Sequence, residues 1–226
     1  MVKGFLVKNR TAFTMLELVF VIVVLGIVAS LALPRMERDT RQEAGDSILS
    51  AIRYTQHLAL SDNVTDPNDA GWQREFWRFG VRTCTGSDIF YYIGSDKDGG
   101  GNINTNEAAV DLANGARLLA AAGSDCSSGT SNGVSENIFI SHKYGIQNTN
   151  MFANCGGGGL DAARYIGFDH LGRPHVGFSG STTPDYSSLM SADCNLTFQF
   201  IDGSADLVIK IEKETGYASI VGQTAS

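Results

Sequence analysis

One long apolar stretch near the N-terminus dominates the pattern of hydrophobic and polar positions. The 21 residues from Phe13 to Leu33 carry one formal charge, the carboxylate of Glu17. As an α-helix rising about 1.5 Å per residue, such a segment spans roughly 30 Å, the hydrocarbon thickness of a bilayer. Lys3, Lys8 and Arg10 precede it, so the positive-inside rule keeps this end in the cytoplasm. The pattern predicts a membrane-spanning helix over residues 13–34.

The helical pattern resumes after Pro34 and predicts one continuous helix from about residue 13 to residue 62. Small and apolar residues recur there at steps of three and four, which places them on one face: Ala44, Ile48, Ala51, Ile52, Thr55 and Leu58. The second half of the helix is therefore expected to pack against a sheet, whereas the first half is apolar on all sides.

Alternation of apolar and polar residues, short apolar runs and turn residues together predict the strands of that sheet. The expected strands are 76–82, 89–93, 138–140, a hairpin of 165–168 with 174–178, and three late strands around 196–200, 207–211 and 217–221. The Ala, Leu and Glu content of residues 106–122 predicts a second helix. The fold class is thus α+β, with a long N-terminal helix, transmembrane and then amphipathic, packed on an antiparallel β-sheet in one domain over residues 35–226.

Glu17 restricts what the apolar segment can be. A signal peptide or a plain anchor would also give such a segment, and Ser30-Leu31-Ala32 offers small residues for cleavage. An ionised carboxylate inside an apolar segment costs about 3 kcal/mol unless a partner neutralises it. The single Glu17 therefore indicates a partner, which neither of those two interpretations supplies.

The stretch Ala12-Phe13-Thr14-Met15-Leu16-Glu17 resembles the prepilin processing site of type IV pilins and type II secretion pseudopilins. The resemblance implies that a prepilin peptidase removes residues 1–12, cutting between Ala12 and Phe13, and methylates the new N-terminus. It places Glu17 at the fifth mature position and Pro34 where pilins have a helix-bending proline. Ala12 departs from the glycine that is usual before the cut, but it is also small.

The same resemblance implies the function of a filament subunit. Such a protein sits in the bacterial inner membrane with a single span and a periplasmic globular domain, and then packs with other pilin or pseudopilin subunits into a pilus or a type II secretion pseudopilus. Glu17 attracts the N-terminal amine of a neighbouring subunit during assembly. Between packed apolar helices little water is present to compete for the carboxylate and the amine, so their attraction is stronger there than in water.

A looser similarity points to the H-type minor pseudopilins. It rests on Trp72 and Trp77, on the turn from Phe168 to Arg173, and on Thr215-Gly216-Tyr217. The alternatives are a major pilin of an adhesive or motility fibre and a DNA-uptake minor pilin. The net charge of −7 counts against nucleic acid as a partner, although Arg164 and Arg173 could form a basic patch.

All four cysteines follow the membrane segment. In the periplasm they are expected to form disulfides, and four cysteines allow three connectivities. Proximity in the sequence favours Cys84–Cys126 and Cys155–Cys194.

Residues 96–107 resemble an EF-hand calcium loop. Asp96, Asp98 and Glu107 occupy loop positions 1, 3 and 12, and Gly101 is the turn glycine at position 6. Asn102 would contribute its backbone carbonyl at position 7, and Asn104 lies at position 9. Gly100 departs from the pattern at position 5, where a side-chain oxygen is usual. The spacing predicts a weak structural calcium site, and a solvated polar turn is the alternative.

Evidence for catalysis is weak. The sequence has no nucleophile elbow, zincin helix or phosphate loop, so an enzyme is not expected. The four histidines are His57, His142, His170 and His175, of which the last two flank a turn and are expected at the surface. A calcium-dependent enzyme on an anchor would need a catalytic constellation that this pattern does not supply.

Overall fold

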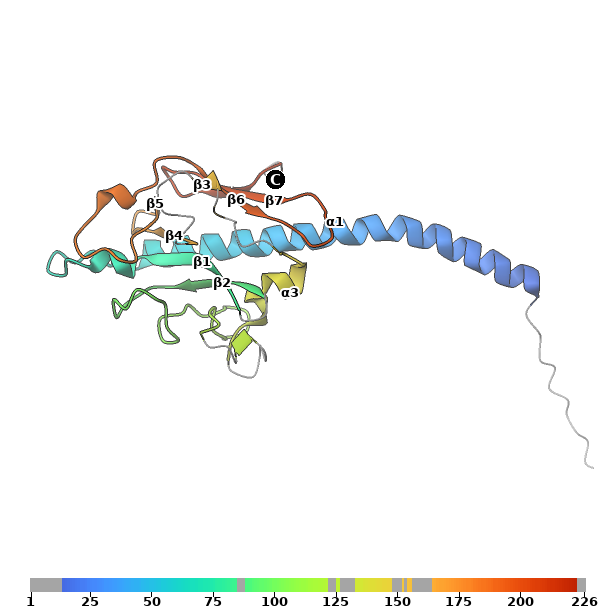
Figure 1. Cartoon of the computed structure of the whole chain (residues 1–226), viewed down its shortest axis with the longest axis horizontal. Helices are drawn as coiled ribbons and strands as arrows, with labels where there is room; N and C mark the ends of the chain where they lie inside the picture. Colours follow the sequence, from blue (N-terminus) through green and yellow to red (C-terminus); the bar gives the residue numbers. More distant parts are fainter. Residues whose placement is uncertain are drawn as a thin grey trace, which may run out of the picture. The chain divides into compact units, whose positions relative to one another are not determined.

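The computed structural model describes residues 14–84, 88–121, 125–126, 133–147, 152, 154–155 and 164–222, with the backbone alone for residues 30–39 and 154–155. The chain divides into two compact units, Met1–Thr40 and Arg41–Ser226. The predicted long helix is confirmed as α1, Met15–Ser61, which is 47 residues long and runs through both units (Figure 1).

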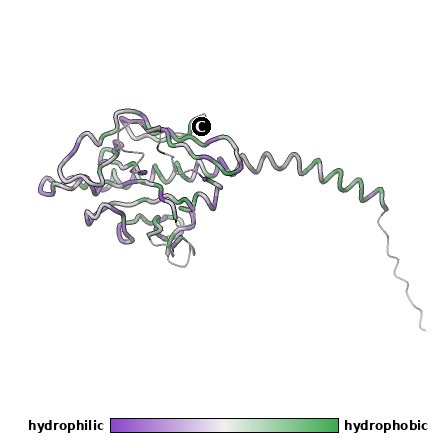
Figure 2. The backbone as a smooth tube through the Cα atoms, in the orientation of Figure 1, coloured by the Kyte–Doolittle hydropathy of each residue, from purple (hydrophilic) through white to green (hydrophobic). Residues whose placement is uncertain are grey.

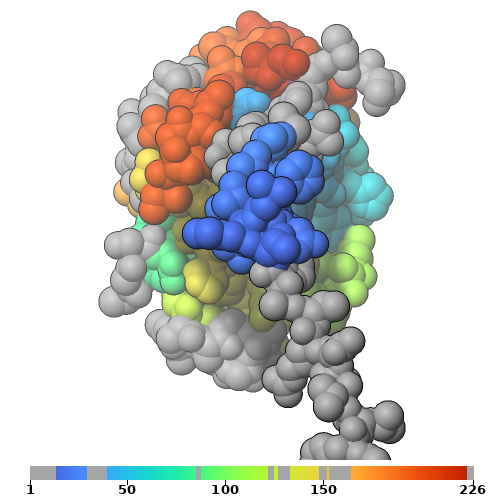
Figure 3. All heavy atoms as spheres, turned by 90° about the vertical axis from the view of Figure 1, so that its right-hand side faces the viewer, coloured from blue at the N-terminus to red at the C-terminus, as the bar shows by residue number. Residues whose placement is uncertain are grey.

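The first part of α1 carries exposed apolar side chains. Between residues 15 and 28 these side chains are 41–87% exposed, Val24 being the least and Met15 the most exposed. Figure 2 shows the hydrophobic character of this part, and Figure 3 shows its side chains as blue spheres. Among the residues described with side chains, no helix reaches the length and hydropathy that a membrane crossing requires. In this part of the chain, side chains are described for residues 14–29, and the predicted span of residues 13–34 is longer than that stretch at both ends.

The described residues of the unit Arg41–Ser226 form two four-stranded antiparallel sheets rather than one. The first has the strand order β2-β1-β4-β5, and the second has the order β3-β6-β7-β8 (Figure 1). The strands of the first sheet are β1 (Trp77–Thr83), β2 (Ile89–Gly94), β4 (Tyr165–Phe168) and β5 (Pro174–His175). The strands of the second are β3 (Asn154–Cys155), β6 (Cys194–Phe198), β7 (Leu207–Ile211) and β8 (Ala218–Ile220). The predicted hairpin and late meander are thereby confirmed.

The second half of α1 packs into the core on the predicted face. Ala44, Ile48, Ala51, Ile52 and Thr55 are buried, whereas Leu58 is only partly buried and Ala59 is buried beside it. Gly45 allows a close approach to the second sheet, because a Cβ atom there would lie 2.9 Å from Ile220 Cδ1 and 3.2 Å from Leu207 Cδ1. Apolar contact on this face, rather than helix propensity, therefore positions the helix.

Polar contacts of α1 reach both sheets. The Gln56 side-chain amide donates to the carbonyl of Gly172 at 2.9 Å, in the turn between β4 and β5, and to that of Thr215 at 2.8 Å, in the turn between β7 and β8. Trp77 Nε1, at the start of β1, donates to Asp62 Oδ2 at 2.9 Å, directly after the helix. These bonds fix the two turns and the first strand relative to the second half of α1.

Two predicted elements are wrong. Residues 106–121 form turns and isolated bridges rather than a helix, because their backbone pairs with the edge of β2: Ala109 donates to Ile93 and Ile93 donates to Leu118. Gly115, with φ +72°, turns the chain between the two bridging segments. Residues 138–140 are not a strand; they end the 3₁₀ turn η3 (Glu136–Ile138) and begin the short helix α3 (Ile140–Tyr144). A run of three apolar residues is too short to show a period, so the sequence does not distinguish a strand from a helix there.

Candidate functional site

The loop that follows β2 brings three predicted ligands together. One carboxylate oxygen each from Asp96, Asp98 and Glu107 lies within 4.8 Å of the others. These residues are separated by up to 11 positions in the sequence, so the loop must fold back on itself to gather them. The proximity that the calcium-loop spacing predicted is therefore present.

Backbone amides of the loop hold the carboxylates in place. Gly101 N donates to Asp96 Oδ2 at 2.7 Å, Asp98 N to Glu107 Oε1 at 2.9 Å, and Asn104 N to Glu107 Oε2 at 2.8 Å. Gly101 has φ +84°, a conformation that favours glycine. A carboxylate oxygen that accepts one such bond retains a lone pair for a cation.

Asp96 is the most buried member of the cluster, with 0% of its surface exposed. Its Oδ2 lies 3.5 Å from Arg78 Nη2, and its Oδ1 is buried without a hydrogen-bond partner. Burial raises the pKa of Asp96, and Glu107 also raises it, against opposing contributions from Arg78 and the Gly101 amide. Three carboxylates beside one guanidinium leave a local charge of −2 when all are ionised, which a divalent cation would neutralise.

The side chains of Asn102 and Asn104 are engaged in hydrogen bonds, whereas the ligand predicted from Asn102 is its backbone carbonyl, which these side-chain bonds do not involve. The Asn104 side-chain amide donates to Asp98 Oδ2 at 2.9 Å, and its oxygen accepts the Asn106 amide at 2.9 Å. Asn102 Oδ1 faces Arg82 Nη2 at 3.4 Å. Gly100 N donates to Asp98 Oδ1 at 2.8 Å and supplies no side-chain oxygen. The candidate cation site is thus a carboxylate triad, with the asparagine side chains engaged elsewhere.

Sequence reasoning missed Arg78. It lies near the start of β1, where an alternating pattern gives its side chain no special role, yet only 1% of its surface is exposed. Arg78 Nη2 also donates to the Gly101 carbonyl at 3.3 Å. An arginine between the aromatic residues Trp77 and Phe79 of a strand next to an acidic loop was the available signal, because buried charges are almost always paired.

Glu17 forms a capping box with Thr14 at the start of α1. Glu17 N donates to Thr14 Oγ1 at 3.3 Å, and Thr14 N donates to Glu17 Oε2 at 3.2 Å. The sequence pattern Thr-x-x-Glu is typical of this arrangement, which satisfies two amide donors at a helix N-terminus. Capping is therefore a second role for Glu17, besides the predicted pairing with an amine. The predicted cleavage residues Ala12 and Phe13 lie outside the described residues.

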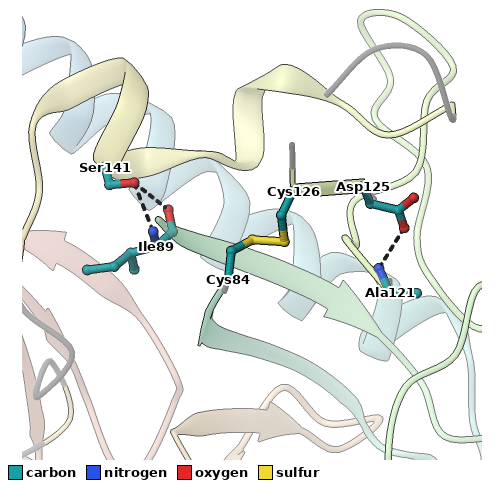
Figure 4. Close-up of a disulfide and its surroundings, with 6 residues drawn as sticks. All are labelled: Cys84, Ile89, Ala121, Asp125, Cys126 and Ser141. Carbon is teal, nitrogen blue, oxygen red and sulfur yellow. Dashed lines mark hydrogen bonds between the residues drawn. A yellow bond between two sulfur atoms is a disulfide. The ribbon is translucent and has the colours of Figure 1, made fainter. Parts of the chain in front are cut away.

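The disulfide Cys84–Cys126 is confirmed, with a Cα–Cα distance of 5.9 Å (Figure 4). It joins the end of β1 to a segment 42 residues later. Ser141 Oγ nearby accepts the Ile89 amide at 2.8 Å and so attaches α3 to β2 (Figure 4). Cys194 is also disulfide-bonded. The backbone of residue 155 pairs with that of Cys194 across β3 and β6, whereas the side chain of the predicted partner, Cys155, lies outside the described part.

His175 is buried, with 3% of its surface exposed, so its predicted surface position is wrong. Its Nδ1 lies 2.9 Å from Ser188 Oγ, and its Nε2 lies 3.4 Å from Asp169 Oδ2. Burial alone would raise the pKa of Asp169, but hydrogen bonds from His175 and Arg173 outweigh it and hold that pKa well below its usual range. Ser188 Oγ donates to the Asp185 carbonyl at 2.7 Å and is buried, so this cluster is a structural network rather than a nucleophile with its base.

No family model, no curated protein and no solved structure matches the chain.

Proposed function

We propose that this chain is a subunit of a type IV pilin-like filament, a minor pilin or a pseudopilin, which a prepilin peptidase processes in the bacterial inner membrane. The observation that carries the proposal is the sequence around the start of α1. A basic leader, the small Ala12, Phe13, and Glu17 inside an apolar run occur together at the spacing of the prepilin site.

The exposed apolar part of α1 supports this proposal. Large apolar side chains on every side of one helix need an apolar environment, because contiguous exposed patches of this kind mark an interaction surface. A bilayer would cover them before assembly, and the helices of other subunits would cover them in a filament. The α+β unit of residues 41–226 would then be the periplasmic part.

We further propose that calcium binds the carboxylate triad of Asp96, Asp98 and Glu107 as a structural ion. Calcium prefers hard oxygen ligands and tolerates irregular coordination, which suits a loop in which one ligand position is a glycine. The buried, unpartnered Asp96 Oδ1 supports a ligand at this point. The ion would neutralise the charge of the triad and fasten the loop to β1 through Arg78.

The alternatives are a major pilin and a DNA-uptake minor pilin. For the latter, Arg164 and Arg173 would have to form a patch. Arg173 is instead bound to Asp169, with Nη2 2.7 Å from Oδ2, and Arg164 lies beside Arg78 and Arg82 at a separate cavity. The described basic residues thus give less support to DNA uptake than to a structural subunit.

Mass spectrometry of the full-length protein, expressed with a prepilin peptidase and extracted from membranes, tests the proposal. We expect N-methyl-Phe13 as the first residue, and no processing in a strain that lacks the peptidase. An N-terminus at Leu33, as a signal peptidase acting after Ser30-Leu31-Ala32 would leave it, would overturn the filament proposal.

A further inference from the structure

A cavity of about 430 Å³ lies over the first sheet, and its lining is rich in arginine although the protein as a whole is acidic. Its lining residues are Arg78, Val81, Arg82, Thr83, Tyr92, Gly101, Asn102, Arg164, Tyr165 and Ser179. Three of these ten are arginine and none is acidic, although the chain as a whole has a net charge of −7. A concentration of positive charge in an acidic protein points to an anionic ligand.

The register of the strands places two of these arginines. Arg78 and Arg82 are four residues apart on β1 and therefore lie on the same face of the sheet. Gly80 lies between them and pairs with Tyr92 on one side and with Tyr165 on the other. The Arg82 guanidinium carbon is 4.5 Å from the centre of the Tyr92 ring, and that of Arg78 is 5.1 Å from the centre of the Tyr165 ring. The two rings therefore support the two guanidinium groups beside the cavity.

The positive charge of this cavity is incompletely neutralised. Arg78 pairs with Asp96, but its Nε is buried without a hydrogen-bond partner. Within the described part of the chain, neither Arg82 nor Arg164 lies within 4.0 Å of a carboxylate oxygen. Arg164 is exposed and has φ +49°, a conformation that is unfavourable for a residue with a Cβ. Its carbonyl accepts the Val81 amide at 2.9 Å, which fixes its backbone beside β1.

We propose that this cavity binds a phosphate or sulfate group. Guanidinium groups pair with such oxyanions through two parallel N–H donors, and arginines from separate strands can approach one tetrahedral anion from different sides. Arg82 and Arg164 are the residues that would contact it, and the buried charge of Arg78 would add to the attraction from beneath. A dianion matches this surplus of charge better than a single carboxylate does.

The tyrosines supply further donors. The Tyr165 hydroxyl oxygen accepts the Ser179 amide at 2.9 Å, so its own proton is free to be donated to the anion. Tyr92 keeps its hydroxyl proton near neutral pH, because the usual pKa of tyrosine is about 10 and burial raises the pKa of Tyr92 further. The cavity volume falls within the range of about 300–1,000 Å³ that is usual for small-molecule sites. The group can therefore belong to a phosphorylated or sulfated small molecule as well as to a free ion.

Calorimetric titration of the full-length protein in detergent, with chelator present, tests this proposal. The probes are sodium phosphate, sodium sulfate and glycerol 3-phosphate, each compared with sodium chloride at equal ionic strength. We expect saturable binding of phosphate or sulfate and none of chloride. Tighter binding of glycerol 3-phosphate would identify an organic phosphate as the ligand, and equal binding would identify the free ion.

The variants Arg164→Gln and Arg82→Gln should each weaken phosphate binding at least tenfold. Lys213→Gln, which removes one exposed positive charge from the turn after β7, is the matched control and should bind like the wild type. Arg164 is exposed, so its replacement leaves the core intact, which circular dichroism would verify. Binding that chloride reproduces, or that Arg164→Gln and Arg82→Gln leave unchanged, would overturn the proposal. The test does not depend on filament assembly.

Discussion

Arg78 Nη2 lies 3.5 Å from Asp96 Oδ2, and both side chains are almost completely buried. The pair joins the start of β1 to the loop after β2, and it links the two sites, because Arg78 lines the cavity and Asp96 belongs to the carboxylate triad. Because Asp98 and Glu107 stand beside the same aspartate, one guanidinium leaves the cluster with a charge of −2. Ion pairs inside proteins stabilise only when their remaining charge and hydrogen-bonding groups are also satisfied.

Calcium should therefore stabilise the protein. A site in the weak range of about 10⁻⁴–10⁻³ M, filled at ten times its Kd, would add about 1.4 kcal/mol to the free energy of unfolding. For a domain of this size, that gain raises the melting temperature by about 3–6 °C. Differential scanning fluorimetry in millimolar calcium and in chelator would measure the difference.

Matched variants distinguish the triad from general charge effects. Asp96→Asn and Glu107→Gln should each abolish the calcium-dependent shift in melting temperature, whereas Glu214→Gln, at an exposed glutamate outside the loop, should retain it. Equal melting temperatures of the wild type in calcium and chelator, together with no heat of calcium binding, would leave residues 96–107 as a polar turn.

Glu17 has two roles that mutation can separate. Glu17→Gln retains the capping box, since glutamine serves at that position, but it removes the charge. Thr14→Ala keeps the charge and removes the cap, at a cost of about 1 kcal/mol to the helix. If the charge pairs with a neighbouring amine, Glu17→Gln should enter the membrane and fail to enter filaments, while Thr14→Ala should assemble. Counting subunits in sheared fibres would show the difference. If Glu17→Gln assembles and Thr14→Ala does not, Glu17 acts in capping alone.

The disulfides should contribute strongly to stability. Cys84–Cys126 closes a loop of 42 residues, which the chain-entropy treatment values at about 4 kcal/mol. We expect the double variant Cys84→Ser/Cys126→Ser to lose a similar amount in urea denaturation at pH 7. A non-reducing peptide map should also link Cys155 to Cys194. A map that links either residue to Cys84 or Cys126 would contradict that connectivity.

The network around Asp169 predicts a pH dependence. The pKa of Asp169 is lower in the folded protein than in the unfolded chain, so its contribution is present above about pH 4 and disappears as the pH falls below that value. Asp169→Asn should lower the free energy of unfolding at pH 7 by about 1–3 kcal/mol, because buried donors lose a charged acceptor. Its stability should also decline less than that of the wild type between pH 4 and pH 2. Asp206→Asn, at an exposed site, should follow the wild-type profile, and parallel profiles for Asp169→Asn would contradict the assignment.

Local patterns in the sequence determined much of the fold. A continuous apolar run followed by a 3.6-residue period predicted α1 and its buried face. The two-residue period predicted β1, β6 and β7, and short apolar runs with turn signals predicted β2, β4 and β8. The spacing of Asp96, Asp98 and Glu107 predicted their proximity, because all three belong to one short loop whose turn is set by Gly101. These features depend on neighbours within one segment, which a sequence displays directly.

Contacts between distant segments required the tertiary structure. The composition of residues 106–122 favours a helix, but hydrogen bonds to the open edge of β2 stabilise an extended chain instead. Arg78 meets Asp96, and His175 enters the core, only after the strands have paired in their observed register. The arginine-lined cavity likewise combines residues from β1, from the loop after β2 and from the start of β4. The free energy of such contacts comes from burial and pairing between segments that are distant in the sequence. A period or spacing within one segment therefore does not predict them.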